Sequence, residues 1–259
     1  MTLRWTALVV ALLAPGCAGS TGGDAFELEA VASGPGASAP GGTYEFRSGR
    51  GFEVVLEEAR LHVGAVYLSR AVGIGVSRDV GCQLPGNYVA ELPGPVDVDL
   101  LAAADTAFTV TGSATEGEAR TGEVWLTGGD VSAPVDPTEI LSVRGVARRD
   151  GAAFPFEGSV TISTNRAKAP PDPALPGSEP ACKLRIASPI PTDLLLAPGR
   201  RLRLRVDPAA FFANVDFTAL PAGAPGEALR FADDDSDPAS ANLYGGLVRT
   251  QAYTFESFR

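Results

Sequence analysis

The residues best suited to chemistry lie in an acidic segment near the C-terminus. Asp233, Asp235 and Asp237 have the one-three-five spacing of a calcium-binding loop, whose hard oxygen ligands suit Ca²⁺. Clustered carboxylates also repel one another, and a bound cation would relieve that repulsion. Pro238 stands where such a loop turns on a glycine. The segment therefore leaves two interpretations open, a calcium site and a solvated acidic turn.

His62 is the only histidine in the chain. A histidine-based zinc or copper site needs more nitrogen or sulfur ligands than this sequence offers. A Ser-His-Asp triad could use His62 in principle, but His62 lies inside a predicted strand and the chain has no Gly-x-Ser-x-Gly elbow. A structural role for His62 is the favoured interpretation, so the sequence predicts no catalytic residue.

Two further sets of side chains could contact a ligand. Arg201, Arg203 and Arg205 alternate with apolar residues, and in an acid-rich chain we expect them to pair with carboxylates across strands; an anion site is the alternative. Trp125 is a candidate platform for sugars, although its position within a strand favours burial. Paired carboxylates for glycoside hydrolysis are easy to imagine among the acidic residues, but none is distinctive.

The overall charge excludes one class of partner. The 259 residues include 21 basic and 31 acidic side chains, for a net charge of −10. Such a chain repels phosphate backbones, so nucleic acid is not an expected partner. No phosphate-binding glycine loop or dinucleotide motif occurs in a strand–helix context, so the sequence predicts no cofactor other than the calcium ion considered above.

The N-terminus carries an export pattern. Arg4 precedes an apolar run over 5–13, and Ala14, Pro15 and Gly16 lead to Cys17. This segment resembles the lipobox of bacterial lipoproteins. The resemblance implies a signal peptide over 1–16, cleavage before Cys17, and a lipid on the Cys17 sulfur that anchors the protein to a membrane of the cell envelope. It also implies the outer membrane, because Cys17 is not followed by aspartate. The apolar run is too short to span a bilayer.

Residues 17–42 are rich in Gly, Ser, Ala and Pro, a composition typical of a flexible tether. The two remaining cysteines, Cys82 and Cys182, lie beside turn signals, and two cysteines in an exported protein most often form a disulfide. A reactive thiol is the alternative. The proline-rich stretch over 167–180 predicts a surface loop, because proline lacks the backbone donor that a sheet requires.

From Thr43 onward, short apolar runs alternate with glycine and proline, which indicates strands and turns. The phase of alternation slips near Glu57, which predicts a bulge or a change of sheet. Asp207 and Pro208 predict the cap and first position of one short helix. The predicted strands cover 52–57, 61–67, 106–111, 123–127, 140–148, 153–163, 201–206 and 247–258.

These patterns predict a single all-β domain over 43–259, an antiparallel Greek-key β-sandwich with one short helix; a closed β-barrel is the alternative. Three functional hypotheses remain. The first is a non-catalytic, envelope-anchored lipoprotein that binds or scaffolds an envelope protein or glycan. The second is a calcium-dependent binding or adhesion module, and the third is an envelope glycan hydrolase.

Overall fold

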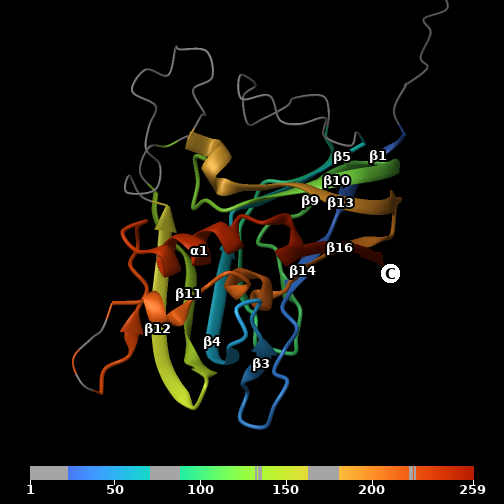
Figure 1. Cartoon of the computed structure of the whole chain (residues 1–259). Helices are drawn as coiled ribbons and strands as arrows, with labels where there is room; N and C mark the ends of the chain where they lie inside the picture. Colours follow the sequence, from blue (N-terminus) through green and yellow to red (C-terminus); the bar gives the residue numbers. More distant parts are fainter. Residues whose placement is uncertain are drawn as a thin grey trace, which may run out of the picture.

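The computed structural model describes residues 23–70, 88–131, 133, 136–162, 181–221, 224 and 226–259 (Figure 1). The predicted signal peptide 1–16, the lipidation site Cys17, the disulfide partner Cys82 and the proline-rich loop 167–180 lie outside these residues. Strands dominate the described chain, in three sheets that we name after one strand of each.

The β10 sheet has the strand order β1-β9-β6-β5-β10-β13, and all its pairs are antiparallel. Its strands are β1 (Ala25–Leu28), β9 (Gly112–Thr115), β6 (Tyr88–Leu92), β5 (Ala65–Ser69), β10 (Gly117–Trp125) and β13 (Ile186–Leu196).

The β11 sheet has the order β15-β12-β11-β4-β3, and β7 also pairs with β4. Its strands are β15 (Leu229–Arg230), β12 (Ala152–Ile162), β11 (Asp136–Arg149), β4 (Glu53–Val63), β3 (Tyr44–Arg47) and β7 (Val96–Asp99). The β14 sheet has the order β16-β14-β2-β8, formed by β16 (Tyr253–Phe258), β14 (Arg201–Val206), β2 (Ala30–Ser33) and β8 (Thr106–Ala107).

One α-helix and four short 3₁₀ helices accompany the sheets within the described residues. They are α1 (Pro238–Leu247), η1 (Ala181–Arg185), η2 (Pro208–Phe212), η3 (Phe217–Ala219) and η4 (Thr250–Ala252). The predicted all-β sandwich is therefore confirmed. Across the described strands no sheet closes on itself, so the alternative barrel is wrong. None of the described helices is long and apolar enough to cross a membrane.

Strand alternation forms the core as the sequence predicts. Val54, Leu56, Leu61 and Val63 of β4 are each no more than 1% exposed. The predicted shift in alternation near Glu57 is a β-bulge. Arg144 pairs with Glu58 and the next residue, Gly145, pairs with Leu56, so Glu57 is an extra residue on β4 with no partner position on β11. The chain changes sheet later, at Gly64 between β4 and β5, where a Cβ would lie 2.0 Å from the carbonyl oxygen of Thr127.

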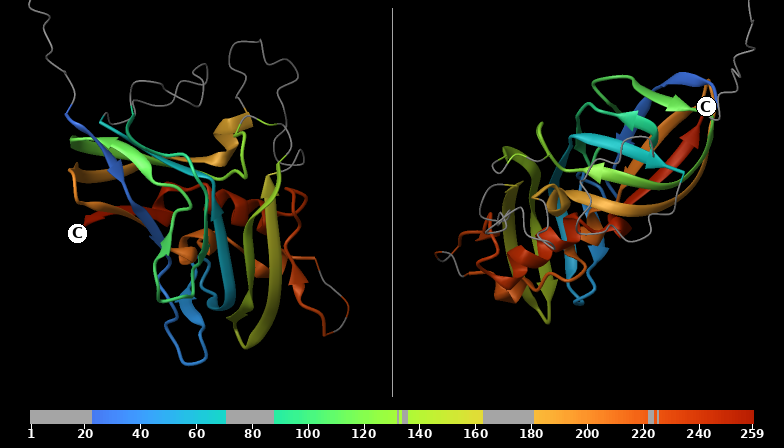
Figure 2. Two further views of the ribbon diagram at one scale, coloured as in Figure 1. Left: turned by 180° about the vertical axis from the view of Figure 1, so that it is seen from behind. Right: turned by 90° about the horizontal axis from the view of Figure 1, so that it is seen from above.

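Two close contacts join the layers. A Cβ on Gly122 of β10 would lie 2.1 Å from the ring of Phe255 on β16, so glycine allows the β10 and β14 sheets to meet. A Cβ on Gly246 of α1 would lie 2.2 Å from the carbonyl oxygen of Phe211 in η2. The short helices lie against the inner side of the β11 sheet (Figure 2). Phenylalanine rings pack between them and the sheet.

The predicted tether over 17–42 is wrong for residues 25–33, which form β1 and β2. Leu28, Ala30, Val31 and Ala32 are buried, and β2 lies between β14 and β8. This segment of small residues forms strands because the neighbouring strands offer backbone hydrogen-bond partners. Backbone hydrogen bonds stabilise a strand whether or not its side chains are large and apolar. The folded region therefore begins before Thr43.

The helix content also differs from the prediction. The helix capped by Asp207 is confirmed as η2, where the Asp207 carboxylate accepts a hydrogen bond from the backbone N–H of Ala209 at 2.9 Å. The longer helix α1 was not predicted. It ends at Leu247, η4 follows, and the strand expected over 247–258 begins only at Tyr253, as β16. The strand expected over 106–111 is reduced to β8.

Candidate functional site

The outward face of the β11 sheet is a polar surface with hollows along it. On β11, Leu141, Val143 and Ala147 are buried, while Ser142, Arg144 and Arg148 point to the opposite side. We call this side, formed by β3, β4, β7, β11, β12 and β15, the outer face. Three hollows lie along it from one end of β11 to the other.

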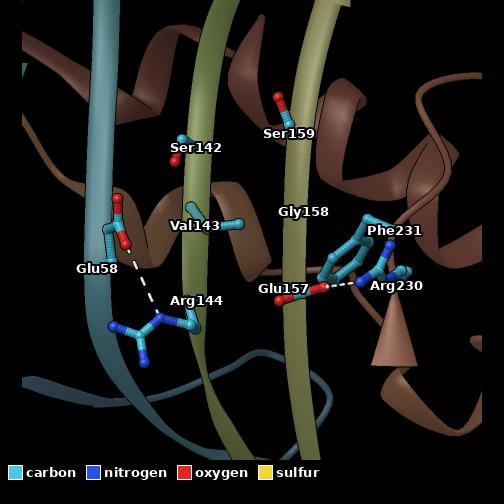
Figure 3. A pocket seen from close by; sticks show the side chains of 9 residues that line it. All are labelled: Glu58, Ser142, Val143, Arg144, Glu157, Gly158, Ser159, Arg230 and Phe231. Carbon is cyan, nitrogen blue, oxygen red and sulfur yellow. Dashed lines mark ion pairs between the residues drawn. The ribbon is translucent and has the colours of Figure 1, made fainter. Parts of the chain in front are cut away.

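The middle hollow has a volume of about 470 Å³ and contains a row of alternating charge (Figure 3). Four neighbouring strands each contribute one residue of this row, paired in register: Glu58, Arg144, Glu157 and Arg230. Arg230 pairs with Glu157 at 2.8 Å, and Arg144 pairs with Glu57 at 3.0 Å and with Glu58 at 3.8 Å. The guanidinium and carboxylate groups therefore hold one another in place and keep further hydrogen-bonding capacity toward solvent.

The upper hollow, of about 440 Å³, shares Ser142 with the middle one and surrounds His62. His62 on β4 and Asp97 on β7 are cross-strand neighbours, and Nδ1 of His62 lies 2.7 Å from Oδ1 of Asp97. The other ring nitrogen, Nε2, is buried and has no hydrogen-bond partner among the described residues. Asp99 and Glu139 add two more carboxylates to the lining.

This arrangement decides how the single histidine can act. Ser142 lines the same hollow, but no hydrogen bond joins it to His62 in the described part of the chain. A general base needs its free nitrogen within hydrogen-bond reach of the nucleophile. Nε2 is shielded instead, so the hollow does not assemble a Ser-His-Asp triad, and the sequence-based preference for a structural His62 fits this geometry.

The lower hollow, also of about 440 Å³, lies at the β3–β4 and β11–β12 turns. Its lining includes Arg47, Glu53 and Arg148, which occupy neighbouring positions on β3, β4 and β11. Arg149 and Asp150 complete its charged groups. The outer face therefore changes character along β11, from mainly acidic around Asp97 to mainly basic at the turns.

The acidic segment near the C-terminus uses its carboxylates within the fold. Asp233 accepts a hydrogen bond from the backbone N–H of Thr161 at 2.8 Å. Asp237 caps α1 and accepts from the backbone N–H and the hydroxyl of Ser240 at 2.8 and 2.6 Å. No group of three or more His, Cys, Asp or Glu side chains in the described ranges, Asp235 included, gathers closely enough to hold a metal ion.

The predicted arginine pairing is confirmed on β14. The pairs are Arg201–Glu29 at 3.2 Å, Arg203–Asp105 at 2.7 Å and Arg205–Glu256 at 2.6 Å. The hydrogen bond from Arg203 holds the pKa of Asp105 below its ordinary value, and a hydrogen bond from Arg205 does the same for the pKa of Glu256. These arginines therefore stabilise the β14 sheet.

The aromatic candidate is buried. Trp125 is 3% exposed, its ring lies 4.5 Å from that of Tyr67, and its N–H donates to Glu123 at 3.0 Å. It therefore offers no surface on which a sugar could stack. Cys182 packs in the same small cluster and is also buried. Because Cys82 lies outside the described residues, its disulfide with Cys182 stays a prediction.

One buried polar arrangement gave no signal in the sequence. Arg185 is fully buried and donates hydrogen bonds to the backbone carbonyls of Val131 and Ala133. Asp136 accepts from the Thr127 hydroxyl at 2.9 Å and from the Gly128 N–H at 2.8 Å. Burial alone would raise the pKa of Asp136, but these hydrogen bonds outweigh it and lower the pKa. Both residues fix the connection between β10 and β11.

Comparisons with known proteins add one similar structure. No family model matches the chain, and no curated protein sequence matches it. MbnP from Methylosinus trichosporium is similar in structure, at 13% sequence identity and a TM-score of 0.41, over 90% of this chain and 98% of that chain. A similarity of this size carries no argument about function.

Proposed function

We propose that this chain is a non-catalytic lipoprotein of the cell envelope whose β-sandwich binds a partner protein through the outer face of the β11 sheet. The observation that carries the proposal is the continuity of that face. Its hollows of about 440, 470 and 440 Å³ follow β11 in sequence, and the first two share Ser142. A surface of this kind offers many directional contacts along one line.

The side chains of the outer face suit a protein better than an uncharged glycan. Carboxylates and arginines line all three hollows, serine hydroxyls line the upper and middle ones, and arginine is enriched where proteins meet. The one aromatic side chain in these linings, Phe231, is only 5% exposed. Sugar rings bind by stacking on exposed aromatic faces, whereas complementary charges give a protein interface its specificity and association rate.

The position of the chain ends fits a surface presented away from a membrane. The described chain begins next to β1, at one end of the molecule, and the β3–β4 and β11–β12 turns lie at the opposite end (Figure 1). If Cys17 carries lipid, as its resemblance to lipoproteins implies, the lower hollow points away from the bilayer. The outer face would then run outward from the anchored end.

Cysteine labelling in intact envelopes tests the proposal. Ser142→Cys places a thiol on the outer face, and Leu195→Cys places one on β13, where Leu195 is 63% exposed. We expect a water-soluble maleimide to modify position 142 at least tenfold more slowly in envelopes than in the purified protein, with no such difference at position 195. Equal rates at position 142 in both preparations would contradict a bound partner on this face.

A further inference from the structure

Two exposed arginines without ion pairs stand together at the lower end of the outer face. Neither Arg47 nor Arg148 makes a side-chain hydrogen bond or ion pair within the described residues. Other arginines on the described strands are paired, as with Arg120 and Asp193 at 3.0 Å or Arg201 and Glu29 at 3.2 Å. In a chain with excess acidic residues, two unpaired guanidinium groups at one site are unexpected.

Next to Arg148 in the chain, the guanidinium of Arg149 is held in a fixed position. The Arg149 guanidinium lies 4.0 Å over the ring of Phe52, which is fully buried, and donates to the backbone carbonyl of Arg50 at 3.5 Å. Its ion pairs with Asp150 and Asp216 are long, at 3.8 and 3.9 Å. The charge of Arg149 is therefore oriented by the fold but only partly neutralised.

Glu53 separates the two unpaired arginines. It pairs in register with Arg47 on one side and with Arg148 on the other, yet it forms no ion pair within 4.0 Å of either. Because neighbouring strands lie about 4.8 Å apart, the two arginines stand roughly 10 Å from each other at the backbone. At that spacing, an acidic segment can place a separate carboxylate on each guanidinium.

We propose that the lower hollow binds an acidic segment of the partner polypeptide, with separate carboxylates on Arg47 and Arg148. This inference rests on the proposed function and names the chemistry of the partner. Guanidinium groups bind carboxylates through two parallel hydrogen bonds, which gives them geometric selectivity. A lipid headgroup fits less well, because the β3–β4 and β11–β12 turns, which carry the lining of the hollow, lie at the end of the molecule opposite β1 (Figure 2).

A fluorescein-labelled hexaglutamate peptide tests this inference. Its binding to the purified full-length protein in neutral detergent is followed by fluorescence anisotropy. We expect Arg47→Gln with Arg148→Gln to weaken binding about tenfold, because two charge-assisted contacts are lost. The control, Arg120→Gln with Arg201→Gln, removes the same charge from two arginines that are already paired, and its dissociation constant should stay within twofold of the wild-type value.

Glu53→Gln should change the affinity for the peptide in the opposite direction. Removing the carboxylate between the two arginines should tighten peptide binding about two- to threefold, whereas general damage to the hollow could only weaken it. Equal binding by the wild type and the Arg47/Arg148 variant would overturn the inference, as would equal losses in both double variants. Inorganic phosphate should compete poorly. If phosphate displaced the peptide at a concentration equal to that of the peptide's carboxylates, the hollow would be a site for single anions and the inference would be overturned.

The outcomes separate the inference from the proposed function. Slow labelling at position 142 in envelopes together with no hexaglutamate binding would refute only the acidic partner segment. Hexaglutamate binding that depends on Arg47 and Arg148, together with unprotected position 142, would refute the proposed face-wide interface and leave the lower hollow as a site for acidic peptides.

Discussion

Two adjacent glycines in α1 should respond in opposite directions to the same substitution. Gly246→Ala places a Cβ 2.2 Å from the carbonyl oxygen of Phe211 and 2.7 Å from its Cα, and these backbone atoms of η2 cannot move without shifting the helix. Overpacking of this kind costs about 1–3 kcal/mol. At Gly245, no atom lies within 4 Å of the added Cβ, so alanine there contributes only its better helix propensity, about 0.5–1 kcal/mol.

Urea and thermal unfolding measure the difference. For a chain of this size, each kcal/mol shifts the midpoint by about 2–4 °C, so Gly246→Ala should lower it by roughly 2–12 °C and Gly245→Ala should raise it by about 1–4 °C. Each glycine serves as the other's control, because both are in one helix. Shifts of the same sign in the two variants would refute the packing of α1 on η2.

Three other expectations follow from hydrogen bonds and from the lipobox. Arg203→Gln should lower the free energy of unfolding by about 1 kcal/mol at pH 7. The Arg203 hydrogen bond depresses the folded pKa of Asp105 below 3.8, so this stabilisation is present above pH 3.8 and lost as the pH falls through the folded pKa. Urea titrations of the two proteins should therefore converge in acid, below pH 3.8. Asp237→Ala should cost about 1 kcal/mol through the lost helix cap, while millimolar calcium should leave the wild-type midpoint unchanged; a calcium-dependent rise would restore the metal interpretation. Cys17→Ala should move the protein from the membrane to the soluble fraction, and a variant that still sediments with membranes would contradict lipid anchoring.

Local patterns of the sequence predicted the parts of the fold that depend on near neighbours. The alternation of Val54 and Leu56 placed β4 and its bulge, and Asp207 followed by Pro208 placed η2. Asp237 and Pro238 form the same capping signal at the start of α1. The aspartates around this signal favour a turn, and Gly245 and Gly246 lower helix propensity, so the local pattern does not indicate a helix here.

The rest depends on contacts between distant segments. β13 contains Pro189 and Pro191, which argue against a strand in isolation, but β13 lies at the edge of its sheet, where a missing backbone donor is tolerated. The outer face likewise depends on contacts between segments that are distant in the sequence. Ser142, Glu58 and Arg230 belong to strands far apart in the sequence, and only the register of the β11 sheet brings them into one hollow. No local signal carries that register.

Site-specific photo-crosslinking in living cells tests the central claim most directly. A photoreactive amino acid at position 142 reports on the outer face, and the same residue at position 195 reports on β13 as a matched exposed control. The account predicts one discrete adduct from position 142, with a protein that mass spectrometry identifies, and none from position 195. No adduct from position 142, or the same adducts from both positions, would contradict binding through the outer face.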